Sequence, residues 1–278
     1  MFGRQKIAAL VAEFLGTGVL TLVLLSVQRS QIGVPFFVAS AAGLAVVLVT
    51  FAFAAVSGAH FNPALTIGMW TARKIGTIKA IGFIAFQLLG GYAAYLLYTY
   101  FVNNKLDSIG GHFTSRILVA EAVGAVILGF GYAAAVYQRF TVGAQAAVSG
   151  LSYLLAIVAA SSASIGLINP AVAFGAQAWV WGTYVLGPIL GAVIGINLYG
   201  LLFADREVVL AGDAISVASS SAAVPATTTS DAAVATRKPR ATTARATRAR
   251  TTTKSATATK TTTRRSTAKK PAANRRKK

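Results

Sequence analysis

The tripeptide Asn-Pro-Ala occurs twice in this 278-residue sequence, as Asn62-Pro63-Ala64 and as Asn169-Pro170-Ala171. Asn is a favoured helix N-cap and Pro suits the first helical position, so each copy predicts the start of a helix. Only about ten residues follow before polar or Gly-containing sequence, which is roughly 15 Å of helix, or half a bilayer. Two side-chain amides at positively polarised helix ends predict a pair of hydrogen-bond donors for the oxygen of a passing solute. The pattern is typical of a pore.

Two glutamates accompany the two tripeptides at nearly the same spacing. Glu13 precedes Asn62 by 49 residues and Glu121 precedes Asn169 by 48. A charge inside a membrane is costly unless it is paired or hydrogen-bonded, so these acids need partners. The favoured interpretation is that each accepts backbone N–H bonds from the loop leading into a half-helix. A proton relay or a cation site is the alternative.

His60 lies two residues before Asn62. One interpretation is that its ring braces the loop before the first half-helix. The other is that the ring lines or gates the pore. The sequence leaves both open, and we group His60 with the two intramembrane glutamates as a structural candidate.

The elements that position these residues are long apolar segments. Hydrophobic residues make up 55% of the chain and the mean hydropathy is +0.63. Stretches long enough to span a bilayer cover residues 7–27, 34–56, 79–102, 117–137, 145–161 and 183–204. Three spans and one half-helix in each half require the two halves to insert with opposite topology. We therefore predict an all-α membrane protein with six transmembrane helices and two half-helices, built as an inverted repeat.

The predicted channel domain covers residues 1–210, with repeats of about 1–105 and 115–210. The chain has no cysteine, which excludes disulfides and thiol chemistry. We find no nucleophile–base pair, metal-ligand cluster or phosphate-binding loop, so no catalytic residue, metal or cofactor is predicted. The class that remains is a channel rather than an enzyme.

The basic residues predict the orientation. One side holds most of the charge outside the spans: Arg4, Lys6, Arg73, Lys74, Lys79, Arg139 and Arg206. The other side holds Arg29, Lys105 and Arg116. We therefore expect a multi-pass protein of the cell membrane with both termini in the cytoplasm.

The segment SGAHFNPALT at residues 57–66 resembles the first signature of the aquaporin, or major intrinsic protein, family. The Ala-Glu-Phe at residues 12–14, Gln87 and Gly187-Pro188 are similar to further features of that family. The resemblance covers about residues 5–205. It implies a right-handed bundle of six helices, a homotetramer with one pore per subunit, and passive conduction of water or small neutral solutes such as glycerol.

The sequence departs from the family at the selectivity filter. Family members typically carry Arg directly after the second Asn-Pro-Ala, where this chain has Val172. Ungapped counting from the two tripeptides places the other filter positions at Ala42, Ile157 and Gly166. These four residues supply no cation, no aromatic ring and no side-chain donor, so we expect a wide apolar filter. Water-only selectivity is therefore not predicted.

The last part of the chain has a different composition. Residues 211–278 are rich in Ala, Thr, Lys and Arg, and include sixteen basic and two acidic residues. Such a segment cannot bury enough apolar surface to fold alone, so we predict a disordered basic tail. Anionic lipid is the favoured partner, with nucleic acid or plain solvent as alternatives. A competing function is therefore a membrane anchor that acts through this tail and has a poorly conducting body.

Overall fold

The computed structural model describes residues 3–30 and 34–204. The predicted basic tail, residues 211–278, lies outside the described residues. Within them the structure is helical and contains no strand. This confirms the predicted all-α fold class for the channel domain.

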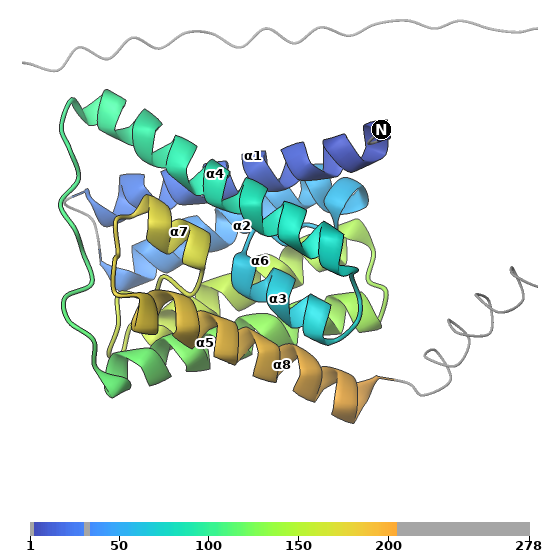
Figure 1. The fold of residues 1–278 in the computed structure, drawn as a ribbon. Coiled ribbons are helices and arrows are strands. Elements are labelled where there is room, and N and C mark those ends of the chain that lie inside the picture. Colours follow the sequence, from blue (N-terminus) through green and yellow to red (C-terminus); the bar gives the residue numbers. More distant parts are fainter. Residues whose placement is uncertain (1–2, 31–33, 205–278) are drawn as a thin grey trace, which may run out of the picture. The chain divides into compact units, whose positions relative to one another are not determined.

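Six helices are long and apolar enough to cross a membrane, as predicted. They are α1 (Arg4–Gln28), α2 (Pro35–Ser57), α4 (Thr77–Val102), α5 (Ser115–Tyr137), α6 (Val142–Ala160) and α8 (Gly187–Phe203), and a π-helical turn (Gly182–Leu186) leads into α8. Their bounds lie within a few residues of the predicted spans. Figure 1 shows α1, α4 and α8 as long helices, with the short α3 and α7 between them.

The two half-helices start where the sequence predicts. α3 (Pro63–Thr71) and α7 (Pro170–Gly175) each begin at the Pro of an Asn-Pro-Ala copy, with Asn62 and Asn169 as N-caps. α7 has six residues rather than about ten. It ends early because Gln177 adopts a left-handed conformation (φ 64°) and the Ala178 N–H bonds back to the Ala173 carbonyl at 2.9 Å.

Each half-helix packs against a long helix of the opposite repeat, as in an interlocked pair. α3 lies against α8, and α7 lies against α4 (Figure 1). Glycines allow both approaches. A Cβ atom on Gly91 of α4 would lie 2.3 Å from the Ala171 carbonyl oxygen, and one on Gly68 of α3 would lie 3.1 Å from the Ala192 carbonyl oxygen. Both contacts are too close for a side chain in place of glycine. Each half-helix therefore depends on the opposite repeat for this part of its packing.

A third close approach joins α2 to α6. A Cβ atom on Gly43 would lie 2.8 Å from the Gly150 carbonyl oxygen, and one on Gly150 would lie 2.6 Å from the Gly43 carbonyl oxygen. The two glycines are 107 residues apart, the same offset that separates Asn62 from Asn169. The crossing of α2 and α6 is therefore reciprocal and relates equivalent positions of the two repeats.

The close contact of α7 with Gly91 predicts that one added methyl group lowers the stability of the protein. Gly91→Ala places a Cβ atom against backbone that cannot move without shifting α7, so we expect a loss of stability of about 1–3 kcal/mol. Thermal unfolding of the purified protein in detergent measures it. The matched control is Gly143→Ala, whose added Cβ meets only ordinary contact with the Phe51 ring at 3.7 Å. Equal melting temperatures for the two variants would contradict the tight seating of α7.

Candidate functional site

The loop before α3 is held by the carboxylate of Glu13. The side chain lies on α1 and is fully buried. Its Oε1 accepts the His60 N–H at 3.1 Å and its Oε2 accepts the Phe61 N–H at 2.6 Å. A carboxylate that accepts several N–H bonds satisfies both its own charge and the buried backbone donors. These are the contacts expected of the bracing interpretation.

Glu121 repeats the arrangement for α7. It lies on α5, is fully buried, and accepts the Leu167 N–H at 3.0 Å and the Ile168 N–H at 2.6 Å. The Ser164 hydroxyl donates to the same carboxylate. Ser164 carried no recognisable pattern in the sequence, because a single Ser between a helix and a half-helix is a common loop residue. Its contact becomes visible only when the loop is folded.

The residue before each N-cap Asn makes a second hydrogen bond, which joins it to the opposite repeat. Phe61 and Ile168 both adopt left-handed backbone conformations, with φ of 48° and 45°. The Phe61 carbonyl accepts from Nδ2 of Asn169 at 2.9 Å, and the Ile168 carbonyl accepts from Nδ2 of Asn62 at 3.1 Å. Non-glycine residues adopt this conformation only at a cost. The hydrogen bonds of each residue's own N–H and carbonyl groups offset that cost.

The amides of Asn62 and Asn169 each have a defined orientation. Oδ1 of Asn62 accepts the Ala64 N–H at 2.8 Å, and Oδ1 of Asn169 accepts the Ala171 N–H at 3.0 Å. Each NH2 group has two hydrogens, and one of them donates to the opposite loop. The described residues offer Asn62 no second acceptor, and Asn169 has only the nearby Tyr153 hydroxyl, with which it makes no hydrogen bond. One N–H of each Asn therefore remains for an oxygen at the centre of the molecule.

The first repeat contains an additional polar network. Nε2 of Gln87 donates to Oε2 of Glu13 at 2.7 Å and to the Thr66 hydroxyl at 2.9 Å. Nδ1 of His60 lies 3.1 Å from the same hydroxyl, and its ring meets those of Phe83 and Tyr132 edge-on. His60 is 5% exposed. These contacts favour the bracing interpretation of His60 over a free gating side chain.

The structure shows two things about the filter residues. Gly166 lies against Ile157, since a Cβ atom on Gly166 would stand 3.1 Å from Cγ2 of Ile157. Ala42, Ile157 and Val172 belong to one apolar cluster, and none of them exposes any surface. These positions therefore lie in buried, apolar surroundings, and the width of the opening stays a prediction. The apolar character of the four positions stands.

An arginine that the sequence analysis assigned only to the outer side contacts the end of α7. Nη2 of Arg29 donates to the Asp107 carbonyl at 2.8 Å and approaches the Ala176 carbonyl at 3.5 Å. The Ile109 N–H donates to the Gln177 carbonyl at 3.2 Å. Arg29 thus places a cation at the C-terminal end of α7, where the helix dipole favours it.

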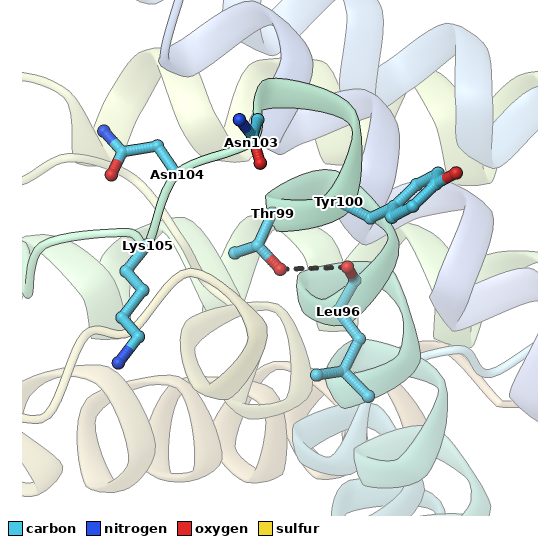
Figure 2. Close-up of a pocket in the computed structure, with 6 residues that line it drawn as sticks. All are labelled: Leu96, Thr99, Tyr100, Asn103, Asn104 and Lys105. Atoms are coloured by element: carbon cyan, nitrogen blue, oxygen red, sulfur yellow. Dashed lines mark hydrogen bonds between the residues drawn. The ribbon is translucent and has the colours of Figure 1, made fainter.

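A surface hollow of about 460 Å³ lies apart from these residues, at the C-terminal end of α4 (Figure 2). Its lining residues are Leu96, Thr99, Tyr100, Asn103, Asn104 and Lys105. Figure 2 shows the Thr99 hydroxyl turned back to the Leu96 carbonyl, at 2.9 Å. None of the candidate residues lines it, and among residues 3–30 and 34–204 no three His, Cys, Asp or Glu side chains gather as a metal site. The candidate site is therefore the pair of half-helix ends.

Known proteins resemble this chain over most of its described part. Residues 3–199 match the model of the family described as Major intrinsic protein. Aquaporin Z of Photorhabdus laumondii subsp. laumondii is 31% identical over 228 residues, which cover 71% of this chain and 98% of that protein. Aquaporin NIP3-1 of Arabidopsis thaliana is 28% identical, covering 71% of this chain and 68% of that protein. Among solved structures, the aquaglyceroporin from Plasmodium falciparum has a TM-score of 0.61 at 20% identity, covering 71% and 96% of the two chains.

The glutamate contacts predict the effect of Glu13→Gln and Glu121→Gln. A glutamine keeps one acceptor but turns an NH2 group toward a backbone N–H, so each variant leaves a buried donor unpaired. We expect each to lose about 1–3 kcal/mol of stability, with poorer assembly and residual conduction. Melting temperature, gel filtration and liposome flux measure the three effects. A fully stable, well-assembled variant without any flux would instead assign the carboxylate a direct part in conduction.

Proposed function

The chain belongs to the major intrinsic protein family, and on that premise we propose that its solute crosses the membrane between the N-terminal ends of α3 and α7. Family membership makes the chain a passive channel for water or small solutes and not an enzyme. The observation that carries the proposed route is that Asn62 donates to the Ile168 carbonyl and Asn169 to the Phe61 carbonyl, which leaves each amide one N–H for a passing oxygen.

The half-helix ends supply the proposed selectivity against charge. Each N-terminus presents about half a positive charge, and the two tripeptides bring both ends together at the centre of the bundle. A water molecule that accepts from both amides has its oxygen occupied, so it cannot also accept a proton from the next water in line. The same positive ends repel cations. Small neutral molecules with an oxygen acceptor meet neither barrier.

We assign Ala42, Ile157, Gly166 and Val172 to the outer constriction. The support is the contact of Gly166 with Ile157 and the burial of the other side chains in one apolar cluster. Without a guanidinium at this level, a solute loses water contacts there and gains no side-chain donor in return. The outer half of the route is then an apolar barrier rather than a charged filter.

We infer a homotetramer in the cell membrane, with both termini cytoplasmic. Members of the family are generally tetramers. Large apolar side chains exposed on the long helices suit contact with lipid or with a neighbouring subunit, as at Leu44, Leu48 and Ile81. The asymmetry of Arg and Lys between the two sides supports the orientation.

The competing proposal, a membrane anchor acting through residues 211–278, makes an opposite prediction on deletion. A channel retains its flux without those residues, whereas an anchor loses its role. Nothing in the described residues favours the anchor, and the paired amides favour the channel. Binding of the tail to anionic lipid or to nucleic acid stays a proposal of its own.

We predict that the purified full-length protein conducts small neutral solutes in liposomes without energy input. Stopped-flow measurements of water, glycerol, urea and ammonia entry test it, with empty liposomes as the baseline. A variant that lacks residues 211–278 serves as the second arm and is expected to match the full chain. Permeability equal to that of empty liposomes for all four solutes would refute the channel proposal.

The outer constriction predicts a change of solute ranking in Val172→Ala. Removal of two methyl groups from a fully buried position widens the route, so glycerol permeability is expected to rise several-fold and water permeability less. Val158→Ala is the matched control, because Val158 is 42% exposed on the outside of α6. If both Val172→Ala and Val158→Ala keep the parent's order of solute permeabilities, Val172 is not at the constriction.

A further inference from the structure

A buried tyrosine on α6 has no assigned role in the site described above. Tyr153 lies one helical turn before Ile157 and is 2% exposed. Its hydroxyl has no hydrogen-bond partner among the described residues. Burying a hydroxyl without a partner is costly, so an unpartnered one in a packed interior calls for an explanation.

The hydroxyl faces the amide of Asn169 without reaching hydrogen-bond geometry. The Asn169 amide already uses Oδ1 for the Ala171 N–H and one hydrogen for the Phe61 carbonyl. Its second hydrogen and the Tyr153 hydroxyl therefore lack partners at the same place. A single oxygen between them would satisfy both groups: it accepts from the amide, and it accepts from or donates to the phenol.

Comparison of the repeats shows that this phenol has no equivalent in the first half. The offset of 107 residues that relates Gly43 to Gly150 relates Val46 of α2 to Tyr153 of α6. Both side chains are buried. The first repeat thus has an aliphatic side chain at the position where the second has a phenol, so Tyr153 breaks the symmetry between the repeats.

On α2 and α6, two further unpartnered hydroxyls lie on one side of Tyr153. Ser149 and Thr50 are buried, and neither hydroxyl has a partner in the described structure. They lie one turn beyond Tyr153 and Val46, toward the connection between α2 and α3. One turn in the other direction, the corresponding positions are Ala42 and Ile157. Tyr153 therefore stands between an apolar pair of positions and a hydroxyl-bearing pair.

We propose that Tyr153 determines which solutes pass: its ring narrows the route beside Asn169, and its hydroxyl hydrogen-bonds the oxygen of each permeating molecule. The inference rests on the proposed channel function and deepens it. The solute class is water and small molecules that carry a hydroxyl or carbonyl oxygen. Because the outer positions bear no side-chain donor, Tyr153 and Asn169 supply the first side-chain hydrogen bonds to a solute that arrives from the Val172 side.

Two substitutions separate the ring from the hydroxyl. Tyr153→Phe keeps the width and removes the hydrogen bond, so we expect water permeability to fall about 2- to 10-fold, the range of one lost hydrogen bond. Tyr153→Val copies the Val46 position and opens the route, so we expect glycerol permeability to rise relative to water. Melting temperature and gel filtration of both variants show whether folding is preserved. Permeabilities of both variants equal to those of the parent would overturn the proposal.

The absence of cysteine from the chain allows a test that a purely structural tyrosine would fail. In Tyr153→Cys the only thiol lies at the proposed contact, and mercuric ion is expected to block flux, with recovery on addition of a reducing thiol. Leu155→Cys is the control, since Leu155 lies two residues away and is 55% exposed on the outside of α6. A Tyr153→Cys channel that mercury leaves open would place this side chain outside the route and overturn the proposal.

The same experiments distinguish failure of this inference from failure of the channel itself. If the parent conducts and the substitutions at Tyr153 do not change its permeabilities, the channel proposal holds and Tyr153 does not line the route. A parent that conducts none of the four solutes overturns the channel proposal and this inference with it.

Discussion

The structure depends on two buried carboxylates that hold two loops in an unfavourable conformation. Phe61 and Ile168 are left-handed, and the N–H of each donates to a glutamate at 2.6 Å. The carbonyl of each then points at the Asn of the opposite repeat. Without the carboxylates, the loops would lose the partners of their buried N–H groups, and the half-helices would lose their fixed starting points. The cost of two buried acids is offset because each satisfies several backbone donors at once.

The interlocked packing of the repeats follows from the same geometry. Each half-helix lies on a long helix of the other half, and glycines at these contacts let one backbone approach another. In a membrane there is little hydrophobic drive between helices, so close packing and hydrogen bonds must supply the association. The small residues and the crossed Asn–carbonyl bonds provide both. The non-helical loops before α3 and α7 are tolerated at membrane depth because they are buried in protein and their backbone groups are hydrogen-bonded.

Much of the fold could be predicted because its strongest features are local. Six apolar spans follow from hydropathy, and the starts of α3 and α7 follow from Asn as N-cap and Pro at the first position. The early end of α7 was missed, because a left-handed Gln177 has no clear mark in the sequence. The width of the filter stays a prediction. Counting from a tripeptide gives positions along a chain, whereas width depends on which apolar neighbours fill the space.

Tyr153 and Ser164 show a different limit of sequence reasoning. The buried helices are apolar on all sides, so their periodicity does not reveal which face is internal. A tyrosine in such a helix is equally suited to the membrane interface and to the core. Only the folded chain shows that the ring is buried and that its hydroxyl has no hydrogen-bond partner among the described residues. Gln87 is among the residues that carry the family resemblance, yet its bond to Glu13 joins residues 74 positions apart and no spacing rule predicts it.

The hydrogen bonds between the two repeats have a consequence for the order in which the chain inserts and folds. When the first hundred residues have left the ribosome, the Asn62 amide has no Ile168 carbonyl to bind and α3 has no α8 to lie on. The first half-helix must therefore wait, in the translocon or at the membrane surface, until the last long helix has been inserted. Insertion of the spans and closure of the pore are separate events. Closure is a single late step in which both loops, both half-helices and both repeats are locked together.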